Sequence, residues 1–140
     1  MPAIRVVART AVVANDATFP SGAGQAGAVL LTGGAVPASS PGTRVGVLLD
    51  VTVGGAGGIV RITIFGYRAD ANQWYTVARL NNGADITPTT QTPVAEGNNI
   101  HYAEVLTSLA SQYDRLYAMI TSIAGAAASV SVAFLIDTQS

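Results

Sequence analysis

The clearest pattern in the sequence is an alternation of apolar and polar residues with a period of two, which is typical of β-strands that bury one face. The alternation is most regular over residues 45–53, where valine or leucine occupies every second position. A second run, residues 59–67, places Val60, Ile62 and Ile64 on one face. Clusters of glycine, proline and asparagine separate these runs, and helical periodicity is scarce. The pattern therefore predicts an all-β protein.

Eight segments have this character. They are residues 4–13, 28–32, 45–53, 59–67, 74–80, 100–106, 113–123 and 130–136. We expect residues 45–80 to form a three-stranded meander and residues 113–136 a closing hairpin, because the strands in each region are separated by short turns. Residues 81–98 are expected to form a long polar loop, and residues 108–112 a helical turn. About eight strands with this spacing predict an antiparallel β-sandwich that is jelly-roll-like, although the pattern does not distinguish a jelly roll from another eight-stranded sandwich.

Residues 15–140 are expected to form a single sandwich domain. Residues 1–14 form either an N-terminal arm, which adds a strand to a neighbour's sheet, or an edge strand of the same domain. The side chains expected to face the core are Val47, Leu49, Val51, Val60, Ile62, Ile64, Trp74, Leu116, Ile120, Val132, Phe134 and Ile136.

Residues 116–136 carry no charge and are long enough to span a bilayer as a helix. However, small residues around Gly125 interrupt the segment, and the sequence alternates with period two on both sides of them. Two strands therefore explain the segment better than a membrane helix. Near the start of the chain, Arg9 interrupts any apolar core of a signal peptide. We expect no membrane partner.

The composition of the chain indicates a subunit of an assembly. Its 140 residues suffice for one domain, and 49% of them are hydrophobic, while only 11% are charged. A typical soluble domain has about 25% charged residues. Such a surface is expected to be covered by neighbouring molecules. The net charge of −1, with scattered basic residues, excludes the basic surface that binding to nucleic acid requires.

The sequence offers little for catalysis. It contains neither cysteine nor lysine, and its one histidine, His101, precedes Glu104 by three residues within a predicted strand. Side chains at that spacing point to opposite faces, so the two cannot form a catalytic dyad on one strand. The sequence of residues 22–27 matches the glycine pattern of dinucleotide-binding loops, but it lacks the flanking strand, helix and acidic residue. We predict a protein that is not an enzyme and has no cofactor.

Two short polar loops could offer oxygen ligands to calcium, namely residues 70–72 and 81–85. Neither has the number of carboxylates that a dedicated site needs, and Asn, Asp and Gly are common in turns for conformational reasons. We therefore predict no metal site.

Arginine and tyrosine are enriched at protein interfaces, and several of them lie in or beside the predicted strands. The residues that we assign to an interface are Ile4, Arg5, Val7, Arg9, Tyr67, Arg68, Tyr75, Arg79 and Tyr117. Tyrosines on a sheet face are also typical of sugar-binding modules, so a carbohydrate-binding β-sandwich is an alternative of a different class.

Three segments carry a resemblance to a known group of proteins. Residues 49–55, 61–67 and 74–78 follow the order strand, glycine turn, strand, polar turn and Trp-Tyr strand. This order resembles small β-sandwich proteins of tailed bacteriophage virions, and the chain end that begins with Tyr113-Asp114-Arg115-Leu116-Tyr117 is similar as well. The resemblance covers residues 44–137.

The resemblance implies a capsid decoration, or cement, protein on the surface of the virion. Its partners would be the major capsid protein, or other virion proteins, and further copies of itself, with a trimer favoured. A component of the neck, tail or fibre adaptor is the alternative within the same class. Proteins of this kind have no catalytic residues, so none is transferred to this chain.

Overall fold

A computed structural model describes residues 4–31, 44–53, 58–87, 94–96, 99–125 and 127–137. In these residues the chain forms nine strands and two short 3-10 helices. The strands are β1 (Ile4–Val12), β2 (Val29–Leu30), β3 (Arg44–Val53), β4 (Ile59–Arg68), β5 (Gln73–Arg79), β6 (Val94–Glu96), β7 (Asn99–Val105), β8 (Arg115–Ala124) and β9 (Ala127–Asp137). The 3-10 helices are η1 (Leu80–Gly83) and η2 (Ser108–Gln112), and η2 confirms the predicted helical turn.

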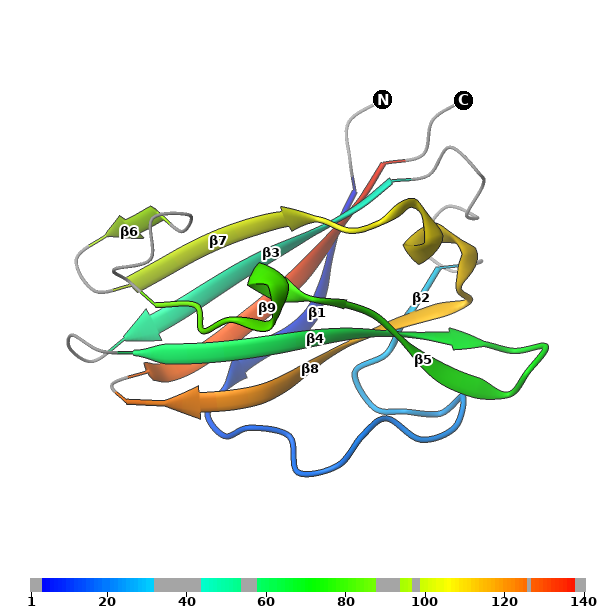
Figure 1. The fold of residues 1–140 in the computed structure, drawn as a ribbon, viewed down its shortest axis with the longest axis horizontal. Coiled ribbons are helices and arrows are strands. Elements are labelled where there is room, and N and C mark those ends of the chain that lie inside the picture. The colour runs from blue at the N-terminus through cyan, green and yellow to red at the C-terminus, as the bar shows by residue number, and fades with distance from the viewer. Residues whose placement is uncertain are drawn as a thin grey trace.

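The strands form two antiparallel sheets that pack face to face (Figure 1). One sheet has five strands in the order β1-β9-β3-β7-β6, and the other has four in the order β2-β8-β4-β5. If the short β6 is left aside, each strand lies in the opposite sheet from the strand that precedes it in the sequence. The one exception is β5, which lies in the same sheet as β4. This is the strand order of a jelly roll. The prediction of an all-β, jelly-roll-like sandwich is confirmed.

The core lies between the two sheets, where the predicted alternation places it. In β3 every second residue from Val45 to Val53 is buried, and in β4 the residues Val60, Ile62 and Ile64 are buried. All the predicted core residues are buried except Trp74, which is half-buried on the outer side of the four-stranded sheet. Phe134 and Ile120 are among the largest side chains that are fully enclosed.

The predicted pairing of neighbouring strands is wrong in two places. Strand β3 pairs with β7 and β9, whereas β4 pairs with β5 and β8, so residues 45–80 do not form a meander in one sheet. Similarly, β8 and β9 lie in opposite sheets and do not form a hairpin. In both places, strands that follow each other in the sequence lie in opposite sheets. Only β4 and β5 form the expected hairpin; residues 54–57 and 126 lie outside the described residues.

The segment predicted as a long polar loop is more ordered than expected in the parts that the structure describes. It begins with η1, and Ile86 then pairs with Val60 and is fully buried. Asn81 and Asn82 both have positive φ angles, which asparagine tolerates better than most residues. Further on, β6 pairs with β7 at the edge of the five-stranded sheet. Residues 88–93, 97 and 98 lie outside the described part.

The first strand lies at the opposite edge of the same sheet. Strand β1 pairs with β9 in antiparallel register, with irregularities after Val7 and after Arg9. The structure therefore places β1 in this chain's own sandwich, as an edge strand. The former membrane-span candidate, residues 116–136, consists of β8 and β9, and among the described residues no helix is both long and apolar enough to cross a bilayer.

Candidate functional site

The outer face of the four-stranded sheet carries a second apolar cluster, separate from the core. It consists of Phe65, Tyr117 and Met119, with Trp74 packed against it. The register of β5, β4 and β8 explains the cluster, because Thr76, Phe65 and Tyr117 form one cross-strand row on this face. The alternation over residues 59–67 puts Phe65 on the side opposite Ile62 and Ile64, but it does not predict that this side is covered.

The cover is supplied by residues 13–28, which we call the covering loop. Its Asp16 is tied to β8 by two hydrogen bonds of 2.8 Å, one from the Asp16 amide to the carbonyl of Ile120 and one from the Ile120 amide to the Asp16 carboxylate. Farther along, the indole of Trp74 donates to the carbonyl of Gly22 at 2.9 Å. The covering loop is therefore fixed to the sheet near its start, at Asp16, and near its middle, at Gly22.

An ion pair beneath the covering loop strengthens this attachment. The guanidinium of Arg9 contacts both carboxylate oxygens of Asp16, at 2.8 and 2.9 Å, and both side chains are largely buried. Arg9 also donates to the Tyr117 hydroxyl at 3.1 Å and to the carbonyl of Ala118 at 3.0 Å. Its charged end lies 5.4 Å from the centre of the Tyr117 ring, in the range of a cation–π contact.

These contacts shift the pKa of two groups, the carboxyl group of Asp16 and the phenol of Tyr117. Burial by itself raises the pKa of Asp16, but the hydrogen bonds from Arg9 and from the Ile120 amide outweigh it, so the pKa lies below the ordinary value of 3.8. Burial raises the pKa of Tyr117, and the positive charge of Arg9 opposes that shift only in part. Asp16 is therefore ionised, and its charge is used within the chain.

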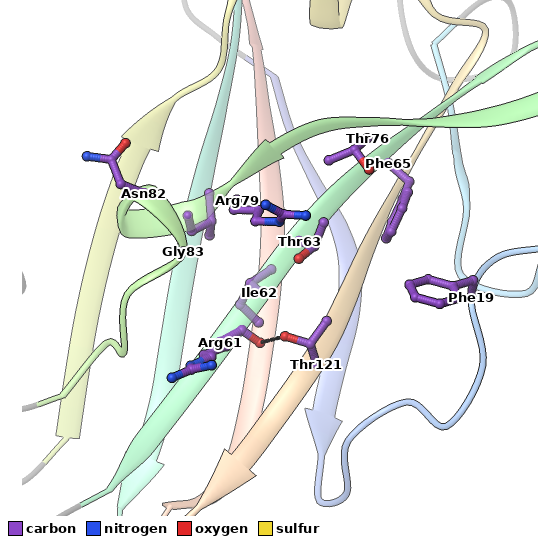
Figure 2. Close-up of a pocket in the computed structure, with 11 residues that line it drawn as sticks. Phe19, Arg61, Ile62, Thr63, Phe65, Thr76, Arg79, Asn82, Gly83 and Thr121 are labelled. Atoms are coloured by element: carbon purple, nitrogen blue, oxygen red, sulfur yellow. Dashed lines mark hydrogen bonds between the residues drawn. The ribbon is translucent and has the colours of Figure 1, made fainter.

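Beside the covering loop, two adjoining pockets of about 640 and 580 Å³ form a groove on the same sheet face. Both are lined by Phe19 and Phe65, whose rings meet edge to face with centroids 5.9 Å apart. We call the two pockets together the aromatic groove. Figure 2 shows its first half, where Arg79 reaches across the sheet above Thr63, and Phe19 faces Phe65 from the covering loop.

The outer face of the five-stranded sheet has no such cover among the described residues. Two neighbouring cross-strand rows on it are apolar apart from Arg5, which lies opposite Leu135 and ends the second row on β1. One row joins Val7, Ala133, Leu48 and Ala103, and the next joins Leu135, Gly46 and Val105. We call the six apolar side chains of these rows, without Arg5 and Gly46, the outer patch. Val7 is 56% exposed and Val105 is 74% exposed. Leu48 and Leu135 are partly exposed, and only Ala133 is buried among its neighbours. The outer patch is thus an apolar sheet face that is partly open to solvent, most of all at Val7 and Val105.

Polar rows border the outer patch on both sides. On one side Arg44 and Asp137 lie opposite each other and form an ion pair of 3.2 Å. On the other side Asp50 lies opposite His101, with its carboxylate 2.8 Å from the imidazole Nδ1. An apolar centre with a polar rim is the usual anatomy of a protein–protein interface. The outer patch also reaches the open edge of the sheet, because Arg5 and Val7 belong to β1.

The nine residues assigned to an interface from the sequence are not brought together in one surface. Ile4, Arg5 and Val7 lie on exposed β1. Tyr75 and Arg68 lie near the turn between β4 and β5, and Arg79 lines the aromatic groove. The remaining three are held inside the chain.

Those three are Arg9, Tyr67 and Tyr117. Arg9 is the partner of Asp16, as described above, while Tyr67 is 4% and Tyr117 is 3% exposed. Arg9 and Tyr117 contact each other beneath the covering loop, whereas Tyr67 packs against Trp74 and donates a hydrogen bond to Asn72. All three side chains are thus largely enclosed within the chain, and their assignment to an interface stays a prediction. The sequence analysis did not predict the outer patch. Most of its members lie in strands whose opposite face carries the regular apolar residues of the core, and only that face was assigned a role.

The described residues contain no cluster of acidic, histidine or cysteine side chains that could hold a metal ion. Of the two loops considered for calcium, Asp70 forms an ion pair with Arg68, and Asp85 forms one with Arg61. Glu104 points away from His101, since it accepts hydrogen bonds from the Tyr102 hydroxyl at 2.6 Å and from the Asn81 amide at 2.9 Å.

No protein-family model, curated protein or solved structure matches this chain. The resemblance to bacteriophage virion proteins therefore stays a prediction. The function has to be inferred from the fold, the outer patch and the aromatic groove.

Proposed function

We propose that this chain is a non-enzymatic structural subunit of a virion, which decorates the capsid and binds both the major capsid protein and further copies of itself. The observation that supports the proposal most directly is the outer patch. Val7 and Val105 are more than half exposed in the isolated chain, and burying such side chains against a partner is favourable by about 1–2 kcal/mol each.

Three further features support the same assignment. The jelly roll is an architecture that viral capsid proteins share with lectins and other binding domains, so it permits the function without requiring it. The low content of charged residues, 11%, suits a chain that is covered by neighbours. The open edge of β1 adjoins the outer patch, so a partner could contact the apolar rows and pair with the edge at the same time.

The first experiment is to measure the native mass of the purified chain at micromolar concentration by light scattering or native mass spectrometry. We expect a closed homo-oligomer, with a trimer favoured, that co-sediments with empty capsid shells of the same virus. A ring of six or twelve copies that does not bind the shells would indicate a component of the neck or tail instead of a capsid decoration protein. A monomer that binds no shell would overturn the proposal.

Two substitutions locate the contact. Val105→Asp places a charge in the outer patch and is expected to abolish assembly. Val13→Asp is the matched control, because Val13 has the same exposed fraction of 74% but lies in the covering loop. Val13→Asp should leave the native mass unchanged. Equal loss of assembly in both variants would argue against the outer patch as the interface.

A further inference from the structure

The aromatic groove is a separate site, because it lies on the sheet opposite the outer patch. Its most unusual member is Phe19, which is 72% exposed although its ring meets the edge of Phe65. Phe65, Tyr117 and Met119 beneath the covering loop are buried and Trp74 is half-buried, whereas the exposed ring of Phe19 lines both pockets at their junction. An exposed ring face in a groove is a surface on which the C–H groups of a flat ligand can pack.

The charge of the groove comes from arginine alone. Arg61 and Arg79 line it, and no acidic side chain does. The charge of Arg61 is neutralised by Asp85, whereas Arg79 has no ion pair or hydrogen bond within the described part of the chain. Arg79 extends over the sheet toward the interior of the groove in Figure 2. The groove therefore favours a ligand with a single negative charge, and a guanidinium suits a carboxylate in particular.

Polar groups complete the lining, and the Thr63 hydroxyl among them lacks a partner in the described residues. Thr63, which lies opposite Arg79 in the register of β4 and β5, is 9% exposed, and its hydroxyl has no hydrogen bond to any described residue. Thr76 occupies the next row, opposite Phe65. In the second pocket, Asn72 and Gln73 add amide groups beside Trp74, and the Asn72 Oδ1 accepts a hydrogen bond from the Tyr67 hydroxyl, which leaves its NH₂ group for a ligand. These groups can exchange hydrogen bonds with several hydroxyls of one ligand.

We propose that the aromatic groove binds an acidic saccharide, with a pyranose ring packed on Phe19 and its carboxylate paired with Arg79. A pyranose combines an apolar C–H face with hydroxyl groups, and a uronic or sialic acid adds one carboxylate, so this ligand class matches the three properties of the lining. A neutral apolar ligand would leave Arg79 and Thr63 without partners, and a single unpaired arginine is too little positive charge for a nucleic acid. The proposal does not depend on the assembly proposed above.

The test is a titration of the isotope-labelled full chain, followed by amide chemical shifts, with two acidic probes and their neutral matches. The probes are tetragalacturonate against its methyl ester, and sialyllactose against lactose. We expect at least one acidic probe to shift the amides of Thr63, Thr76 and Arg79, and its neutral match to bind about tenfold more weakly, because a hydrogen bond to a charged group is lost.

Two variants and one control assign the binding to the groove. Arg79→Gln and Phe19→Ala, both at exposed positions, should each weaken binding of that probe by about tenfold. Arg44→Gln removes the same charge from the other sheet, where Arg44 is 64% exposed, and should leave the affinity unchanged. The proposal is overturned if no acidic probe shifts these amides, if acid and neutral match bind equally, if both groove variants keep the wild-type affinity, or if only an acidic peptide such as tetraglutamate binds.

Discussion

The outer faces of the two sheets differ in how their apolar side chains are covered. Each carries apolar side chains on the side that faces away from the core. On the four-stranded sheet the covering loop buries Phe65, Tyr117 and Met119, whereas on the five-stranded sheet the side chains of Val7 and Val105 are open. The first face is completed within the chain. The second has no cover in the described residues, and it is where we expect another molecule to bind.

The ion pairs of the two faces also differ, because those of the four-stranded sheet are covered and those of the five-stranded sheet are exposed. Beneath the covering loop, Arg9 and Asp16 are largely withdrawn from water and satisfy each other and the backbone of β8. Around the outer patch, the charged pairs stand at the rim and are exposed. Buried polar contacts fix one arrangement of a chain, while exposed ones contribute little to stability. The outer face of the four-stranded sheet is therefore held in one arrangement by the chain itself, whereas that of the five-stranded sheet is not held in this way by the described residues.

The largest effect is expected when the two faces lose apolar side chains in parallel. Phe65→Ala removes a buried ring and should lower the free energy of unfolding by about 3 kcal/mol. Val105→Ala removes two methyl groups that are already exposed to water, so it should change that free energy by less than about 0.5 kcal/mol in the dissociated chain. Both values come from urea unfolding, measured at a concentration at which the chain is monomeric.

Either of two results would contradict the difference between the two sheet faces. If Val105→Ala destabilised the monomer as strongly as Phe65→Ala, residues outside the described part of the chain would cover the outer patch. If Phe65→Ala had no effect, the covering loop would not be seated on the sheet in solution.

The second effect concerns the ion pair that holds the covering loop. Asp16→Asn removes the negative charge but keeps the shape of the side chain, which leaves the largely buried Arg9 without its counter-charge. We expect the free energy of unfolding to fall by about 2 kcal/mol, less than for a fully buried pair because both side chains retain some exposure.

The matched control for this variant is Asp70→Asn. Asp70 forms an equally short contact with Arg68, 2.7 Å, but it is exposed at the turn between β4 and β5. Its urea midpoint should stay at the wild-type value. A similar loss of stability in both variants would mean that the ion pair of Arg9 and Asp16 stabilises the fold no more than an exposed ion pair does.

The fold could be predicted to the level of strands and buried faces, but not to the level of strand pairing. Alternation over β3 and β4 tells which side chains face the core, and residues such as Leu49 and Ile62 are found there. The same alternation arises whether the next strand continues the sheet or crosses to the opposite one. For this reason β3 and β4, and likewise β8 and β9, are expected to pair but lie in opposite sheets, and no local residue pattern distinguishes the cases.

The candidate surfaces were predictable only in part. Exposed Val7 and Arg5 followed from the edge position of the first strand, which the sequence suggested. The covered outer face did leave a signal: Phe65 and Tyr67 alternate with Ile64 and Gly66, so β4 has large side chains on both faces, as strands that are covered on both sides do. The role of Phe19 depends on a contact between segments far apart in sequence, which periodicity does not report.

The third effect is the pH dependence of the covering loop. Because the pKa of Asp16 is lower in the folded chain than its ordinary value of 3.8, the ionised carboxylate stabilises the fold. This contribution is complete above pH 3.8 and is lost as the pH falls through the lower, folded pKa. The difference in urea midpoint between wild type and Asp16→Asn should therefore be constant from pH 7 to about 5 and shrink below about 4. A difference that stayed constant down to pH 2.5 would show that the Asp16 charge does not stabilise the loop.

The smallest effect belongs to the rim of the outer patch. Asp50 and His101 lie opposite each other on neighbouring strands, but their side chains are 48% and 43% exposed, so water screens the pair. Asp50→Asn should change the free energy of unfolding by less than about 0.5 kcal/mol and the association constant of the oligomer by no more than about fivefold. Light scattering across a dilution series measures the association, with Val105→Asp in parallel. If Asp50→Asn dissociated the oligomer as completely as Val105→Asp, the interface would be centred on the polar row. The contrast between a self-covered face and an apolar face left for a partner would then fail, because charge rather than apolar area would decide where the neighbour binds.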